Sequence, residues 1–110
     1  MAYDEVLAGH VRAQLGRLDG LSEKRMFGGL AFLLSGNMCC GVNGDDLIVR
    51  LAPEQTDDAL SRAYTRVFDL TGRPMKGWLL VQPGGLETEA ELAGWVRMAV
   101  EYASTLSAKK

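Results

Sequence analysis

Histidine and cysteine are scarce in this chain, which has one histidine and two cysteines among its 110 residues. Cys39 and Cys40 are adjacent, so they provide no disulfide framework, and such scarcity is typical of a reducing compartment. Neighbouring side chains of a strand point to opposite faces, so we expect these thiols not to ligate one metal together. With His10 as the single histidine, we predict no metal site and no cofactor, and we interpret the cysteines as small buried residues.

The chain also lacks a long apolar segment. No run approaches the ~20 residues that a helix needs to cross a bilayer. The first ten residues contain Asp4 and Glu5 and no apolar core of a signal peptide. We therefore expect a cytoplasmic protein without a membrane partner.

Neither sign of charge dominates, since the formal net charge is -2 at pH 7. Aromatic residues make up 7% of the chain and do not alternate with basic residues, as they would in a platform that stacks single-stranded nucleic acid. Direct nucleic-acid binding is therefore not expected. The length, with 47% hydrophobic residues, predicts a single domain over residues 1–110 that ends in a short tail.

The most informative segment is a run of apolar stretches and tight turns between Lys24 and Arg50. Asn43-Gly44 is typical of a two-residue hairpin turn, and Ser35-Gly36-Asn37 is a second break. These breaks predict antiparallel strands at residues 25–34, 38–42 and 47–51. Alternation then places one set of side chains on a common face: Leu30, Phe32, Leu34, Met38, Cys40, Val42, Leu47 and Val49.

The opposite face of this sheet is also expected to be apolar. It would carry Phe27, Ala31, Leu33, Cys39 and Ile48. A sheet with two apolar faces needs two covers, so we predict helices over one face and a homodimer interface at Phe27, Leu33 and Ile48 over the other. The alternatives are a cover made by the same chain and a register that is shifted by one residue.

Two helices flank the predicted strands. Residues 3–17 carry apolar side chains at intervals of three and four, and Asp19-Gly20 is predicted to end this helix. Pro53, followed by acidic residues, opens a short helix over residues 53–64.

The rest of the chain predicts two strands and a final helix. The strands lie at residues 66–70 and 78–82. Thr88, with Glu91 three positions later, is a capping-box pattern that starts the helix, and Gly94 within it is expected to pack closely against the sheet. The predicted order is α-β-β-β-α-β-β-α, a two-layer α+β fold with a mostly antiparallel, five-stranded sheet.

A glycine-rich loop from Thr71 to Gly77 carries two cations. Such loops direct backbone N–H groups and cations toward an anion, and a glycine pair within a strand leaves room for a close approach. One hypothesis is therefore an anion or acidic-partner site formed by Arg25, Gly28, Gly29, Arg73 and Lys76. The alternative is a solvated loop with ordinary surface charges.

No group of residues predicts catalysis. His10 lies beside the apolar stripe of the first helix, with no nucleophile or carboxylate partner at a suitable spacing. The acidic pairs fall in a turn and at helix starts, where each has a structural explanation. We therefore predict that the protein is not an enzyme.

Four short segments form a specific combination. They are KRMFGGLAF at 24–32, GNMCCGV at 36–42, DDLIVR at 45–50 and TGRPMKGW at 71–78. In this order they resemble the N-terminal domain of the TfoX/Sxy family, over nearly the whole chain up to about residue 106. The resemblance implies a small α+β domain like that of secretion chaperones and supplies no catalytic residues.

Named members of that family regulate natural competence together with a cyclic-AMP-responsive transcription factor. In them a helical C-terminal domain follows, whereas this chain ends at Lys110, so we expect a stand-alone N-terminal domain. The resemblance implies a regulatory or protein-interaction module whose partner is a protein, such as a transcription factor. The alternative is a small protein that binds an anion or a phosphorylated ligand through its Gly28-Gly29 and Arg73-Lys76 segments.

Overall fold

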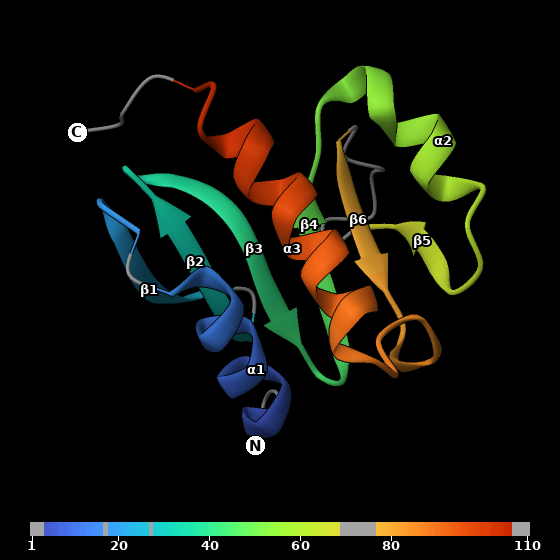
Figure 1. Ribbon diagram of the computed structural model, residues 1–110, viewed down its shortest axis with the longest axis horizontal. Coiled ribbons are helices and arrows are strands. Elements are labelled where there is room, and N and C mark those ends of the chain that lie inside the picture. Colours follow the sequence, from blue (N-terminus) through green and yellow to red (C-terminus); the bar gives the residue numbers. More distant parts are fainter. Residues whose placement is uncertain (1–3, 17, 27, 69–76, 107–110) are drawn as a thin grey trace.

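Figure 1 shows the computed structural model of the chain, an α+β fold in which helices pack on a sheet. The structure describes residues 4–16, 18–26, 28–68 and 77–106. Six antiparallel strands lie in the order β1-β2-β3-β4-β6-β5. The elements are α1 (Glu5–Leu15), β1 (Leu21–Met26), β2 (Gly29–Leu34), β3 (Asn37–Asn43), β4 (Asp46–Arg50), the 3-10 turn η1 (Pro53–Gln55), α2 (Thr56–Leu60), β5 (Thr65–Val67), β6 (Trp78–Val81), the 3-10 turn η2 (Pro83–Gly85) and α3 (Glu89–Ala103).

The predicted fold class is confirmed, but the sheet has six strands instead of five because the first predicted strand is a hairpin. Met26 pairs with Gly29, which leaves two residues for the turn between β1 and β2. Gly28 has a φ of +73°, as the second residue of such a turn requires. A Cβ on Gly29 would lie 2.1 Å from the backbone oxygen of Val42, so β2 and β3 meet too closely there for a side chain.

The turn between β3 and β4 is displaced by one residue from its predicted place. Asn43 pairs with Asp46, so Gly44 and Asp45 form the turn. Val42 consequently pairs with Leu47, whereas the predicted two-residue turn at Asn43-Gly44 would have paired it with Asp45. The pairing has shifted by two residues, which leaves each side chain of this hairpin on its predicted face.

A β-bulge at Cys39 overturns part of the predicted pattern. Phe32 pairs with Cys40 and Leu33 pairs with Met38, which leaves Cys39 without a partner on β2. An extra residue in one strand reverses the faces that follow it. Cys39 therefore joins Cys40 in the core beneath the helices, whereas Met38 packs on the opposite face, so both predictions were wrong.

The helices α1 and α3 lie together on one face of the sheet (Figure 1) and cover the main core. α1 ends at Gly16, where φ is +63°, before the predicted stop at Asp19-Gly20. α2 is shorter than the predicted helix over residues 53–64, because a 3-10 turn fills its start and an irregular turn follows it. Among the described residues no helix is long and apolar enough to cross a membrane.

The other face of the sheet holds a smaller core. Its buried members are Ala31, Met38, Ile48 and Phe68, with Leu33, Trp78 and Leu80 half-buried around them. Because Phe68 follows β5 and Trp78 begins β6, this chain contributes part of the cover of its own second face.

Candidate functional site

The predicted anion site is placed only in part. Arg25 is exposed on β1, at one edge of the sheet. Arg73 and Lys76 lie outside the described residues, between β5 and β6, and three strands separate β1 from β6. Gly28 and Gly29 have the structural roles given above, in the turn and at the close approach to β3. The convergence of these cations stays a prediction.

The three residues of the predicted dimer face have different surroundings. Ile48 is completely buried within one chain, and Leu33 is half-buried. Phe27 lies outside the described residues. Dimerisation stays a prediction, in which Ile48 would support the interface from beneath and not touch the partner.

The two cysteines are buried side by side, with no exposed surface on either residue. The interaction between the two neighbouring thiols lowers the pKa of Cys39 and, together with burial, raises the pKa of Cys40 well above its ordinary value. The predicted burial is therefore confirmed, but the expectation that the thiols point apart was wrong because of the bulge. His10 is exposed on α1, so it shares no open cleft with these buried thiols.

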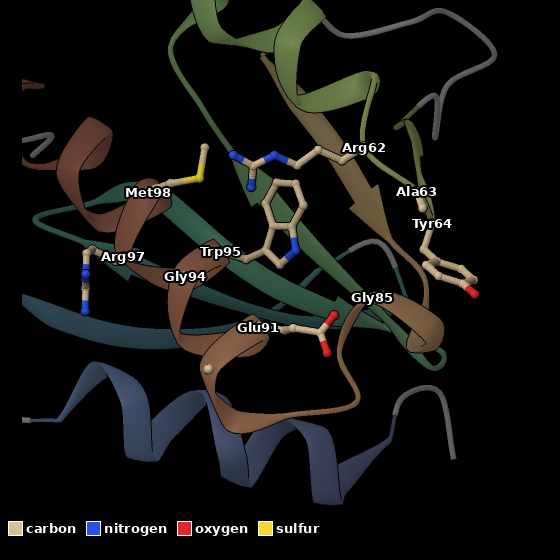
Figure 2. Close-up of a pocket in the computed structure, with 10 residues that line it drawn as sticks. Arg62, Ala63, Tyr64, Gly85, Glu91, Gly94, Trp95, Arg97 and Met98 are labelled. Carbon is tan, nitrogen blue, oxygen red and sulfur yellow. The ribbon is translucent and has the colours of Figure 1, made fainter.

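A site that is more open than the surroundings of the cysteines lies beside α3. A hollow of about 580 Å³ is bounded by α3, the turn between α2 and β5, and η2 (Figure 2). We call it the α3 groove and define it by Arg62, Tyr64, Gly85, Glu91, Gly94 and Trp95, all of which line it.

Trp95 forms the floor of the α3 groove. Its side chain is packed into the main core, and the residue is only 6% exposed. Figure 2 shows that the nitrogen-bearing edge of its indole ring is turned toward Gly85 and Tyr64. No described residue accepts a hydrogen bond from this N–H, and no side-chain nitrogen or oxygen in the described part of the chain is both buried and unpaired. The N–H therefore opens into the groove.

Charged groups stand on two sides of this ring. The guanidinium carbon of Arg62 lies 5.0 Å from the centre of the Trp95 ring, within the range of a cation–π contact. The side chain of Arg62 has neither a hydrogen bond nor an ion pair among the described residues, so its guanidinium N–H groups are available. Glu91 is at the start of α3, where Thr88 donates a hydrogen bond of 3.2 Å to its Oε1 atom.

Tyr64 closes the side of the groove opposite α3. Its ring packs on the backbone of η2, because a Cβ on Gly84 would lie 2.4 Å from the ring atom Cε1. The backbone oxygen of Tyr64 accepts a hydrogen bond of 2.7 Å from Gln82. These contacts hold Tyr64 at a φ of +66°, a left-handed conformation that costs a non-glycine residue about 1 kcal/mol.

Gly94 does not pack closely against the sheet, so that prediction was wrong. The residue is exposed, and a Cβ added to it would meet nothing within 4 Å. Its missing side chain instead leaves the wall of the α3 groove low beside Trp95.

The α3 groove could not be recognised in the sequence. Arg62 and Tyr64 come from a turn that was predicted to be helical, and Trp95 had the spacing of an ordinary core residue. One available signal was Gly94 next to Trp95, because a glycine inside a helix needs a reason beyond helix stability.

The sequence profile of the TfoX N-terminal domain matches residues 13–103. No curated protein and no solved structure matches the chain significantly. The matched segment runs from the last turn of α1 to the end of α3 and so includes the whole sheet. The chain belongs to the TfoX N-terminal domain family.

Proposed function

We propose that this chain is a non-enzymatic regulatory module that acts in the cytoplasm by binding a protein partner at the α3 groove. Family membership supports the regulatory role, because the family is that of competence regulators. By analogy with those regulators, the proposed partner is a protein of the transcription machinery.

The single observation that carries this proposal is the composition of the groove. Tryptophan, tyrosine and arginine are the residues that most often dominate the binding energy of protein interfaces. Trp95, Tyr64 and Arg62 meet here, and Tyr64 is 53% exposed although its backbone is strained. The groove volume of about 580 Å³ accommodates a short segment of a partner.

A crosslinking experiment tests the proposal. A photoreactive amino acid at the exposed position Ala90, on the groove wall, is used to capture the partner, which is then identified and purified. Its affinity is measured by calorimetry for the native chain, for Gly94→Leu and for the control Gly9→Leu. Both glycines are exposed in helices with open space beside them, but only Gly94 lines the groove.

We expect Gly94→Leu to weaken binding at least tenfold and Gly9→Leu to leave it unchanged. Equal binding by both variants, with circular dichroism showing that both are folded, would exclude the α3 groove as the docking surface.

A further inference from the structure

The indole N–H of Trp95 points to the chemistry of the group that the α3 groove receives. Although the residue is only 6% exposed, this N–H opens into the groove and has no acceptor among the described residues. A ligand that supplies an acceptor at this place pairs a donor that no described residue pairs. The ligand therefore presents an oxygen acceptor to the groove floor.

The charges around Trp95 indicate that this acceptor is anionic. Among the described residues that line the groove, Arg62 and Glu91 are the charged side chains beside the indole, whereas Figure 2 shows Arg97 directed away from it. Arg62 is also the cation placed over the indole, with its planar N–H fork unpaired. A guanidinium of this kind matches a carboxylate in a bidentate geometry, and such charge-assisted bonds are about twice as strong as neutral ones.

Glu91 distinguishes a carboxylate from a phosphate. Its side chain lines the same groove, and Figure 2 shows its carboxylate below the indole ring, on the opposite side from Arg62. A doubly charged phosphate would be repelled more strongly by this group than a carboxylate with a single charge. Glu91 can in turn accept a hydrogen bond from an amide N–H, so donor and acceptor positions of the groove fit a peptide.

The apolar part of the groove fits a peptide main chain. Gly94 and Gly85 present backbone without side chains, and Met98 adds a flexible apolar wall. We propose that the α3 groove binds a short peptide segment of the partner, and that an Asp or Glu side chain of this segment accepts hydrogen bonds from the Trp95 indole and Arg62. This inference rests on the proposed function and names the chemistry of its partner.

The Trp95 indole signal provides a direct test by two-dimensional ¹H–¹⁵N NMR. Trp78 is the second tryptophan and does not line the groove, so Trp78→Phe leaves the Trp95 signal alone in the indole region. The probe is a hexapeptide with blocked ends, composed of alanine with one central Glu, and it is compared with the same peptide carrying Gln. Inorganic phosphate is titrated as a third probe.

We expect the Glu peptide to shift the Trp95 signal in a saturable manner, and the Gln peptide to bind at least tenfold more weakly. Arg62→Gln should reduce the affinity for the Glu peptide at least fivefold. Arg66→Gln, which changes an exposed arginine outside the groove, should have no effect. Thermal melting verifies that both variants are folded, since Arg62 contacts a core residue.

Three outcomes would overturn the inference: equal shifts by the Glu and Gln peptides, an unchanged affinity in folded Arg62→Gln, or saturation by phosphate alone. Any of them is distinguishable from failure of the proposed function. The proposed function fails if the purified partner binds the Gly94→Leu variant as tightly as it binds the Gly9→Leu variant, and this result does not depend on the peptide titrations.

Discussion

At the scale of single residues, the glycines of this chain have opposite roles that depend on what surrounds them. Gly29 lies where two strands meet so closely that a methyl group would overlap a backbone oxygen. Gly9, in the middle of α1, has open space around it. The same substitution by alanine should therefore have opposite effects at these two positions.

We expect Gly29→Ala to destabilise the protein by at least about 2 kcal/mol, because the Val42 backbone in the adjacent strand cannot yield as a side chain would. Gly9→Ala should instead stabilise it by about 0.5–1 kcal/mol, since alanine favours the helix. Urea unfolding of both variants measures these changes in free energy. Similar values for the two variants would contradict the described packing of β2 on β3.

At the scale of elements, a pair of charged side chains joins α1 to the edge of the sheet. The Nε atom of Arg12 lies 2.7 Å from Oε2 of Glu23, and its Nη2 atom lies 2.8 Å from Oε1. This bidentate contact is the main reason that the pKa of Glu23 is lowered, and burial opposes it. The side chains are 48% and 37% exposed, so solvent screens their attraction.

The lowered pKa predicts how this contact depends on pH. Ionised Glu23 adds stability above its ordinary pKa of 4.5, and the contribution disappears as the pH falls through the lower pKa of the folded state. Glu23→Gln should therefore cost about 0.5 kcal/mol near neutral pH and nothing in strong acid. Denaturant unfolding at both pH values measures the difference, and Glu101→Gln, another exposed glutamate, is the control. A cost that persists in strong acid would show that the carboxylate charge is not its origin.

The elements differ in how well the sequence specified them. The start of α3 was predictable because Thr88 accepts a hydrogen bond of 3.1 Å from the backbone of Glu91, which is the contact that the capping pattern encodes. β1 was partly missed because LSEKRM is polar along an edge strand and has no apolar alternation. The bulge at Cys39 was missed since Met38, Cys39 and Cys40 are all apolar, so either face satisfies them.

At the scale of the whole molecule, both faces of the sheet carry packed side chains, as the sequence indicated. The helices cover the main core, and the second face has its own cluster around Ile48. The α3 groove, in contrast, depends on long-range folding. Arg62 and Trp95 are brought together only when α2 and α3 pack beside the sheet, which no local pattern encodes.

A substitution of Ile48 tests whether this residue belongs to the core of one chain or to an interface between two copies. We expect Ile48→Ala to lower the free energy of unfolding by about 2–4 kcal/mol, because the residue is completely buried in one chain. The molecular mass in sedimentation should stay the same as that of the native chain. A change in mass without loss of stability would show that Ile48 contacts a second copy directly.

The edges of the sheet have a consequence for behaviour at high concentration. β5, at one edge, has three residues, and β1, at the other, carries the exposed charges of Glu23, Lys24 and Arg25 in succession. A foreign strand that joined β1 would have to dehydrate charges on both of its surfaces, and β5 offers too short a template. Both edges therefore disfavour the addition of further strands, which protects the domain against growth into fibrils at high protein concentration.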